Sequence, residues 1–372
     1  MVVGAGPAGI STWLHLQKRA PSLADRTVVV DAAFFPRAKL CGGAVGAWSD
    51  AVLNHLAVDL DIPSSTIPDV VFCYRGEAWI YHSPTPFRMV ERADFDAALV
   101  RTAVQRGLVF REAEPLIDVK RQAGGLLVST RQRTYRVKAI VGADGVFSAV
   151  RRALVSSRRA RLAPTIQVTA PVDPQFDPEF DRHQLKIDFS PLNDGLQGYA
   201  WHFPWRSPSG AFINHGIGDF RIFPGRPRAR MKKLFDRELR ERRITIGPSH
   251  WSSHPIHRFS RDEPIAQPNV ILVGDAAGIE PAFGGGIHLA LSYGDIAAQA
   301  LVDAFRRDEF SFRDYRWRIA SHYMGRHIQE CTRLAARLYG GRENPLTPVR
   351  QFFTGQSNRQ NLLHLLLRPR HA

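Results

Sequence analysis

Three glycine-rich segments, far apart in the chain, have the residue types that bind phosphate groups. The first, MVVGAGPAGIS, places Gly4, Gly6 and Gly9 in a GxGxxG pattern between a short apolar run and a helical pattern. The first glycine allows a tight turn, the second lets the backbone approach a pyrophosphate, and the third lets helix and strand pack closely. The next apolar run, TVVVD, ends at Asp31, about 20 residues later, where a ribose-binding acid is expected. This spacing predicts a nucleotide cofactor.

Two later segments repeat the pattern of an apolar strand that runs into glycine and aspartate. In AIVGADGVFSAVRR (139–152) the strand is followed by Asp144 and Gly145, an arrangement that also suits an ordinary turn. In NVILVGDAAGIEPAFGGGIHLALSYGDIAAQAL (269–301) a strand precedes Asp275, and three glycines open a long apolar helix. Backbone amides of such a glycine run form a cradle for an anion. The third segment therefore predicts a second anion-binding helix start.

Cys41 lies in PRAKLCGG (36–43), after Arg37 and Lys39 and directly before two glycines. Glycines without a Cβ let a loop pass close to a flat ligand, and the two cations suit phosphate groups of a cofactor or substrate. The alternative for Cys41 is a buried small hydrophobic residue. The three cysteines lie far apart without a CxxC pair, which argues against a disulfide framework, a metal site and an iron–sulfur cluster. Cys73 is expected to be structural.

The stretch GYAWHFPW (198–205) reads as an alternating strand. Its period of two puts Tyr199, Trp201 and Phe203 on one face and His202 on the other. An aromatic stripe of this kind belongs to a hydrophobic core or lines an apolar pocket. Tyr199 and His202 are the groups in this stretch that can donate a proton.

Together and in this order, the three glycine-rich segments resemble FAD-dependent oxidoreductases of the glutathione-reductase type, which include aromatic hydroxylases and geranylgeranyl reductases. The segment VERADFDAAL (90–99) is similar to the R-x-x-F-D-x-x-L element of that superfamily. FPRAKLCGG and LQGYAWHFPW resemble the PR-x-K-x-CGG and G-Y-x-W-x-F-P elements of the geranylgeranyl reductase branch. The chain therefore looks like a member of that branch.

The resemblance implies FAD as cofactor, with the GxGxxG segment on its pyrophosphate, Asp275 on the ribityl chain, and Gly285 and Gly286 near the isoalloxazine. It implies that Arg92 lies near FAD and that Cys41 lies beside the flavin ring. The full set of expected cofactor-binding residues is Gly4, Gly6, Pro7, Ala8, Gly9, Asp31, Arg37, Lys39, Cys41, Gly42, Gly43, Arg92, Asp144, Gly145, Gly274, Asp275, Gly284, Gly285, Gly286 and Ile287.

An α/β fold is expected, because strands and helices alternate at both ends of the chain while the middle is rich in strand patterns. We expect a Rossmann-like FAD-binding domain of the glutathione-reductase type, a second domain with a mixed or antiparallel sheet that binds substrate, and a helical C-terminal region. The predicted FAD-binding domain is discontinuous and comprises residues 1–70, 91–155 and 258–300. The substrate domain comprises 71–90 and 156–257, and the C-terminal region comprises 301–372.

The resemblance implies an oxidoreductase in which reduced flavin transfers hydride to an apolar substrate, with an isoprenoid double bond as the candidate. Cys41, Tyr199 or His202 would supply the accompanying proton, unless ordered water does. Since a second GxGxxG is missing from the sequence, NAD(P)H would visit the flavin transiently, or another donor such as a ferredoxin or quinol would reduce it.

Two other functions remain open at this stage. One is a monooxygenase of the same fold that hydroxylates an aromatic or apolar compound through a flavin C4a-hydroperoxide. A halogenase is disfavoured because the strand has the form GYAWHFP and not W-x-W-x-I-P. The other is a non-enzymatic, flavin-binding scaffold at a membrane surface, against which the intact Asp31, Asp144 and Asp275 argue.

The net charge of +15 suits anionic membranes, nucleic acid or acidic substrates alike. The arginines are scattered and accompany no helix-turn-helix, zinc-finger or RNP pattern, so specific nucleic-acid binding is not expected. The basic amphipathic stretch ARMKKLFDRELRERR (229–243) and the C-terminal NLLHLLLRPRHA favour either packing on the fold or peripheral contact with an anionic membrane. No apolar run reaches the roughly 18 residues that span a bilayer, and we expect a cytoplasmic protein.

Overall fold

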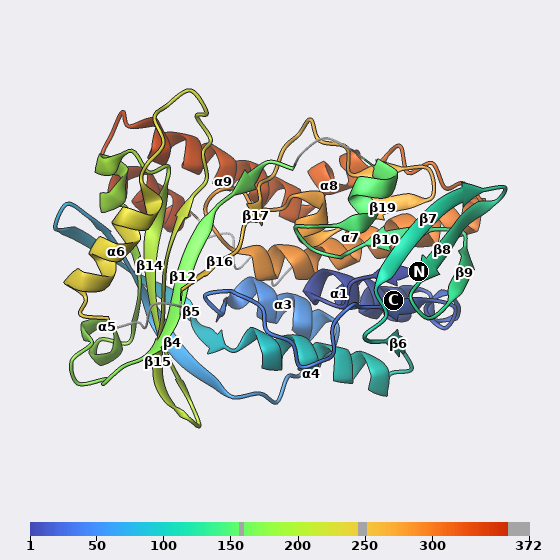
Figure 1. Cartoon of the computed structure of the whole chain (residues 1–372), viewed down its shortest axis with the longest axis horizontal. Helices are drawn as coiled ribbons and strands as arrows, with labels where there is room; N and C mark the ends of the chain where they lie inside the picture. The colour runs from blue at the N-terminus through green and yellow to red at the C-terminus, as the bar shows by residue number, and fades with distance from the viewer. Residues whose placement is uncertain (156–159, 245–250, 356–372) are drawn as a thin grey trace.

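In the computed structural model, two sheets lie at opposite ends of an elongated molecule, with helices between and around them (Figure 1). The structure describes residues 1–155, 160–244 and 251–355. The C-terminal stretch NLLHLLLRPRHA, which we expect to pack on the fold or to contact an anionic membrane, lies outside these residues. The expected α/β fold with a Rossmann-like sheet, a second mixed sheet and C-terminal helices is confirmed.

The first sheet has six strands, which in spatial order are β18 (Ala266–Gln267), β19 (Val270–Leu272), β10 (Ile140–Gly142), β1 (Val2–Val3), β2 (Val28–Val30) and β6 (Val109–Arg111). All neighbours pair in parallel except β18, which is antiparallel to β19. The central strands are buried and rich in valine and isoleucine, as parallel strands covered on both faces require. The loops that follow the carboxyl ends of β1, β10 and β19 therefore start from one edge of this sheet.

Helices surround this sheet: α1 (Pro7–Arg19), α2 (Pro21–Ala24), α3 (Ala47–His55), α4 (Arg92–Gln105), α7 (Gly286–Arg307) and α8 (Tyr315–Ser321). Helix α1 packs directly against α7. A Cβ added to Gly294 in α7 would lie 2.4 Å from Ser11 Oγ in α1, so glycine permits the close approach of these helices. A smaller antiparallel sheet of β7 (Leu116–Gln122), β8 (Gly125–Thr130) and β9 (Thr134–Val137) contributes to the same apolar core.

The second sheet has eight strands, which in spatial order are β16 (Ser252–Ser253), β12 (Thr165–Pro171), β15 (Gly210–Asp219), β14 (Gly198–Ser207), β13 (Gln184–Asp188), β4 (Ser64–Tyr74), β5 (Glu77–Val90) and β3 (Ala44–Val45). Its pairs are antiparallel apart from the parallel pair of β13 and β4. Strands β11 (Leu162–Ala163) and β17 (Ile256–His257) form a separate two-stranded sheet. The domain boundary expected at residue 70 cuts β4, which belongs to the larger sheet from Ser64 onward.

Helices cover both faces of the eight-stranded sheet. On one face, the apolar side of α6 (Met231–Glu241) packs on β12 and β15, together with the short α5 (Pro178–Asp181). Leu234, Phe235 and Leu239 of α6 are buried there, so this apolar side packs on the fold. On the other face, α9 (Tyr323–Gly340) supplies Leu334, Leu338 and other residues to a second cluster.

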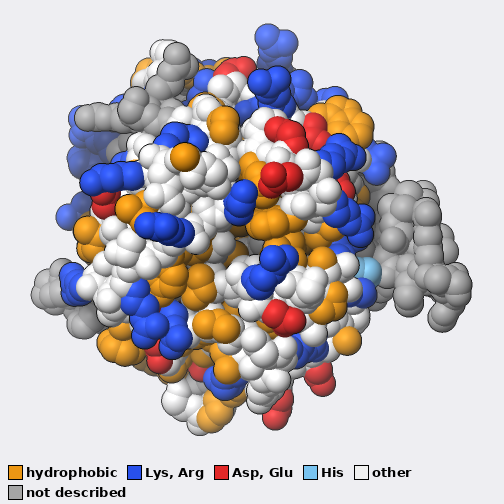
Figure 2. Space-filling model, turned by 90° about the vertical axis from the view of Figure 1, so that its right-hand side faces the viewer, with side chains coloured by type: hydrophobic (Ala, Val, Ile, Leu, Met, Phe, Trp, Pro, Cys, Tyr) orange, Lys and Arg blue, Asp and Glu red, His pale blue; other side chains and the backbone are white. Residues whose placement is uncertain are grey.

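The end of the molecule that carries β7, β8 and β9 faces the viewer in Figure 2, and its Lys and Arg side chains are scattered among apolar and acidic ones. They form no single stripe on this face. Within the residues that the structure describes, no helix is both long and apolar enough to cross a membrane.

Candidate functional site

A cavity of about 760 Å³ lies where the loops of the six-stranded sheet meet the eight-stranded sheet. Segments from along most of the chain line it, and they include all the residues expected to bind FAD apart from Gly9. Tyr199 also lines the cavity, whereas His202 does not. The cavity has a glycine-rich half with charged groups and an aromatic half on the larger sheet.

The three glycine-rich segments converge at the glycine-rich half of the cavity. Gly4 has φ +104°, and a Cβ there would lie 2.2 Å from Ala143 O in the second segment. A Cβ on Gly274, in the third segment, would lie 2.8 Å from the Ala8 Cβ. Gly9 faces inward, where a Cβ would lie 1.9 Å from Gly4 O, so it serves the packing of helix on strand.

Helix α1 starts at this convergence point with an N-terminus that no side chain caps. Gly6 is its N-cap and provides no side-chain hydrogen bond, and its first turn contains no acidic residue. The amide of Ala5 donates to Asp31 Oδ2 at 2.7 Å, and Asp31 Oδ1 accepts from the Ala33 amide at 2.9 Å. Asp31 is thus held at the end of β2 beside the helix start. An uncapped N-terminus that faces a cavity suits a phosphate group.

The hydrogen bonds of the Asp144 side chain lie within its own turn. Its carboxylate accepts from Ser148 Oγ at 2.5 Å and from the amides of Ala149 and Val150 at 2.7 and 3.1 Å. Burial raises the pKa of Asp144, and these hydrogen bonds oppose the rise. The carboxylate therefore stabilises the turn after β10, which is the ordinary turn that the sequence pattern also suits. Asp144 lines the cavity as well.

A buried network supports the turn at Gly274–Ala277 that carries Asp275. His257 is fully buried, and its Nδ1 lies 2.9 Å from Asp275 O, to which it donates. Its Nε2 lies 2.8 Å from Glu263 Oε2, and the same oxygen accepts from Arg151 Nη2 at 2.7 Å. Burial would raise the pKa of Glu263, but His257 and Arg151 lower it. Sequence reasoning missed this network because its members come from separate segments.

Two arginines of the cavity wall share one buried carboxylate. Arg92 bonds both oxygens of Asp96 at 3.0 Å, and Arg37 Nη2 lies 3.0 Å from Asp96 Oδ2. Asp96 is fully buried. Burial would lower the pKa of Arg92, but Asp96 and Cys41 raise it above its ordinary value. This cluster, which we call the Asp96 network, fixes both guanidinium groups at the cavity wall.

Cys41 is held by two hydrogen-bond donors. Arg92 hydrogen-bonds to its side chain, and the Gly43 amide lies 3.4 Å from its Sγ. Next to it, Lys39 Nζ lies 2.7 Å from His254 Nε2 and 3.9 Å from Asp275 Oδ2. Burial lowers the pKa of Lys39, and the charge of Asp275 opposes this.

A second open helix N-terminus faces the cavity at the start of α7. Gly284 and Gly285 have φ +89° and +93°, and Gly285 is an N-cap without a side-chain hydrogen bond. A Cβ on Gly284 would lie 2.8 Å from the Tyr199 hydroxyl, and one on Gly285 would lie 2.5 Å from His288 Cε1. Gly284 and Gly285 are therefore required by both conformation and space.

The aromatic half of the cavity is built on the larger sheet. Strand β14 presents Tyr199, Trp201 and Phe203 to it, as the period of two predicts. The facing positions of β15 are small: a Cβ on Gly216 would lie 2.1 Å from the Trp201 ring, whose Nε1 donates to Asn214 Oδ1 at 2.7 Å. Further apolar lining comes from Val70, Phe72, Phe87, Leu185, Ile187, Phe220, Phe283, Phe352 and Phe353.

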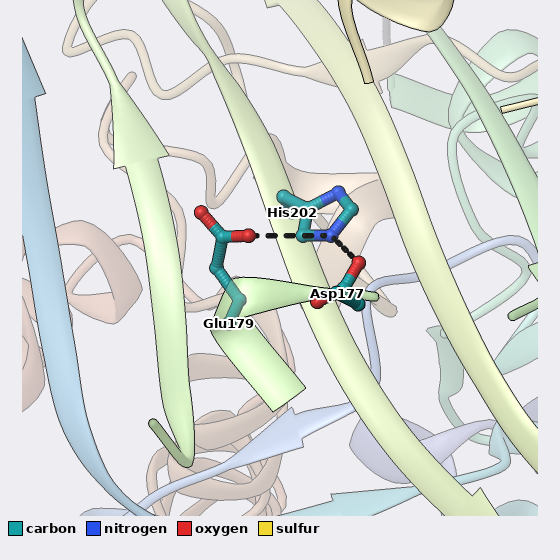
Figure 3. Close-up of side chains that lie close together, drawn as sticks. All are labelled: Asp177, Glu179 and His202. Atoms are coloured by element: carbon teal, nitrogen blue, oxygen red, sulfur yellow. Dashed lines mark hydrogen bonds and ion pairs between the residues drawn. The ribbon is translucent and has the colours of Figure 1, made fainter. Parts of the chain in front are cut away.

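His202 lies on the opposite face of β14, and the prediction that it donates a proton in this cavity is corrected. Its Nε2 lies 2.8 Å from Asp177 Oδ2 and 3.8 Å from Glu179 Oε2 (Figure 3). Burial lowers the pKa of His202, and the bond to Asp177 opposes this. The three side chains could hold a metal ion by proximity, but Lys186 and Arg242 already lie beside Glu179 at 3.8 and 3.3 Å. Two cationic side chains of the protein, Lys186 and Arg242, therefore already pair with the acidic side of this cluster.

Sequence reasoning also missed Glu280, an acid of the cavity wall in GDAAGIEPAFGGG. Its Oε1 accepts from the amides of Gly284 and Phe283 at 2.8 and 2.9 Å. Burial raises the pKa of Glu280 to about 7, and Asp275 adds to the rise while the two amides oppose it. The position of Glu280 between Asp275 and the glycine run is visible in the sequence and could have indicated a residue of the site. The burial of its side chain is not visible there.

These observations fit FAD. Two helix N-termini whose N-cap residues make no side-chain hydrogen bond face one cavity. Gly284 and Gly285 lack the Cβ that would fill the space beside the second, and two arginines paired with the buried Asp96 lie at the wall. The aromatic half of the same cavity has a lining that suits an apolar molecule.

Known proteins resemble this chain over most of its length. The family described as FAD binding domain matches residues 1–305. Digeranylgeranylglycerophospholipid reductase 1 of Methanopyrus kandleri is 26% identical, with 98% of this chain and 96% of that protein covered. Menaquinone reductase of Mycolicibacterium smegmatis is 25% identical, with 81% and 76% covered.

Solved structures share the fold. A geranylgeranyl bacteriochlorophyll reductase-like protein from Thermoplasma acidophilum has a TM-score of 0.73 at 21% identity, with 93% of this chain and 88% of that chain covered. The halogenase PltM has a TM-score of 0.76 at 15% identity, with 98% and 82% covered.

Proposed function

Since this chain belongs to the FAD binding domain family, we propose that it reduces a carbon–carbon double bond or quinone ring of an apolar, isoprenoid substrate. The protein is an FAD-dependent oxidoreductase, and the named reductases among its relatives confirm the resemblance to geranylgeranyl reductases. The observation that carries the proposal is the continuity of the glycine-rich and aromatic halves of one cavity. A flavin in the first half would face an apolar substrate in the second.

The residues that would hold FAD follow the geometry of the glycine-rich half. The N-terminus of α1, with Gly6, Pro7 and Ala8, would take the pyrophosphate, and Asp31 a ribose hydroxyl. Asp275 would contact the ribityl chain. Cys41–Gly43 and Gly284–Ile287 would border the ring, with Arg37, Lys39 and Arg92 supplying positive charge. When bound, FAD supplies the hydride chemistry.

The aromatic half would orient the substrate and exclude water. Phe72, Phe203, Phe353 and their neighbours present apolar surface, and Trp201 is fixed by its bond to Asn214. Such a lining suits a prenyl chain, whose burial is favourable by about 0.8 kcal/mol per CH₂ group. It also keeps the reacting carbons away from bulk solvent.

The test is anaerobic reduction of the purified FAD protein with NADH, NADPH or dithionite, followed by rapid mixing with geranylgeranyl diphosphate or menaquinone. We expect reoxidation of the flavin with formation of the reduced prenyl product. A second mixing with oxygenated buffer addresses the monooxygenase alternative. A transient absorption band distinct from those of oxidised and reduced FAD, with a hydroxylated product, would contradict the reductase proposal.

We infer that NAD(P)H is the electron donor. The reduction experiment above tests this, because it compares NADH and NADPH with dithionite.

Peripheral contact with an anionic membrane stays a prediction. Its reason is the net charge of +15, and flotation with anionic and zwitterionic vesicles would test it. A protein that floats with anionic vesicles and retains FAD, but transfers electrons to neither prenyl compound, would favour the scaffold alternative.

We expect Cys41→Ser to retain FAD and to change turnover by less than about tenfold, well below the effect of losing a general acid or base. Arg92 and the Gly43 amide both use the sulfur as an acceptor, and serine can accept the same bonds. FAD content, from the absorbance of the purified protein, and turnover of geranylgeranyl diphosphate are the measurements. A loss of about a hundredfold or more with full FAD content would instead assign Cys41 a direct role.

A further inference from the structure

Glu280 is the buried acid that the proposed function leaves unused. It is 4% exposed and lies in the cavity wall directly before the glycine run. The Gly284 and Phe283 amides donate to Oε1, and the Ala282 backbone also interacts with the carboxyl group. Its own loop therefore fixes the carboxyl group in the wall of the cavity.

The charged and titratable groups around Glu280 are mostly acidic or neutral. Asp275 faces it from the preceding turn, Tyr199 from β14, and Cys331 and Tyr339 from α9. None of these groups carries a positive charge. Within residues 1–155, 160–244 and 251–355, these neighbours supply no cation that compensates for burial of the carboxylate, which explains why its neutral form persists near pH 7.

Tyr199 is the other candidate proton donor in this part of the cavity wall. The side chains of Tyr199 and Glu280 both lie beside Gly284. The Tyr199 hydroxyl occupies the space that a Cβ on Gly284 would take, and the Gly284 amide donates to Glu280. Burial, and then the nearby Glu280, raise the pKa of Tyr199 far above its ordinary value. Since a general acid works best with a pKa near the operating pH, the carboxyl group is the better donor at neutral pH.

We propose that the Glu280 carboxyl group donates the proton that completes reduction of the substrate double bond. This inference rests on the proposed function. One carbon of the double bond accepts hydride, and the other forms a C–H bond with the Glu280 proton as the π bond breaks. The substrate gains two electrons and two hydrogens, the reduced flavin is oxidised, and Glu280 is left as a carboxylate that regains a proton from solvent.

The test compares Glu280→Gln, Tyr199→Phe and the exposed control Glu77→Gln, each loaded with FAD. We expect E280Q to keep its FAD and its rate of flavin reduction, and to reduce geranylgeranyl diphosphate about a hundredfold more slowly. The wild-type rate should fall as pH rises through about 7, because the acid must be protonated. E280Q should lose this dependence, Y199F should keep it, and E77Q should match the wild type.

A second readout needs no turnover. Infrared difference spectra between about pH 6 and about pH 8 should show a buried protonated carboxyl group in the wild type that is absent in E280Q. E280Q that reduces substrate at the wild-type rate, or a pH dependence that disappears in Y199F, would overturn the role of Glu280 and leave the reductase proposal standing. A reduced wild-type protein that transfers electrons to neither prenyl compound would overturn both.

Discussion

Gly6→Val is expected to give a folded protein whose affinity for FAD is at least about a hundredfold weaker, a loss of roughly 2.7 kcal/mol. Gly6 has φ −70° and ψ 179°, which valine adopts readily. The single atom that a Cβ there would meet within 4 Å is Arg37 Nη2, at 3.3 Å, and a shift of a few tenths of an ångström relieves this contact. The added side chain would instead occupy the place where a pyrophosphate approaches the N-terminus of α1.

The other glycines of the segment cannot serve in this experiment. A Cβ on Gly9 would lie 1.9 Å from Gly4 O, and Gly4 itself has a positive φ, so substitutions there would disturb the fold. A control is Gly225→Val, since Gly225 is exposed and a Cβ there meets nothing within 4 Å. The measurements are the FAD content of each purified variant and the affinity for FAD, from titration of the FAD-free protein with FAD. G6V that purifies with about one FAD per chain would contradict our placement of the pyrophosphate.

Asp96→Asn is expected to lower the free energy of unfolding by about 3 kcal/mol, at the lower end of the range for breaking a buried ion pair. Asp96 is fully buried and bonds Arg92 and Arg37, whose side chains are 9% and 20% exposed. Asparagine keeps the shape but removes the charge that compensates both arginines. The partial exposure of Arg37 moderates the loss, because solvent screens its charge.

Urea unfolding of the FAD-free and FAD-bound proteins, followed by tryptophan fluorescence, measures this change. The slope against urea should stay constant while the midpoint falls, and saturating FAD should recover part of the stability. Asp118→Asn is the control, because Asp118 and Lys120 form an exposed pair, 47% and 74% exposed, worth less than about 1 kcal/mol. Equal stability of D96N and the wild type would mean that the Asp96 network contributes little to folding.

The sequence alone determined the local features of the site. Gly4, Gly6 and Gly9 follow from the geometry of a strand–turn–helix, and Asp31 follows from the spacing to the next strand. The alternation in β14 put Tyr199 and Trp201 together and His202 on the other face, because side chains of a strand alternate. These relations hold within one element or between neighbours in the chain, so residue type and spacing suffice to predict them.

Only the tertiary structure decided which of these residues share a cavity and how each one ionises. The period of β14 does not say which face meets the cavity, and the packing of α6 on one side and α9 on the other settled that His202 lies outside. Arg92 and Asp96 are four residues apart, but Arg37 joins them from a distant segment. Glu280 stands in a readable motif, yet its pKa of about 7 depends on the burial that β14 and α9 impose. Desolvation and charge are properties of the assembled surroundings, and no local pattern in the chain encodes them.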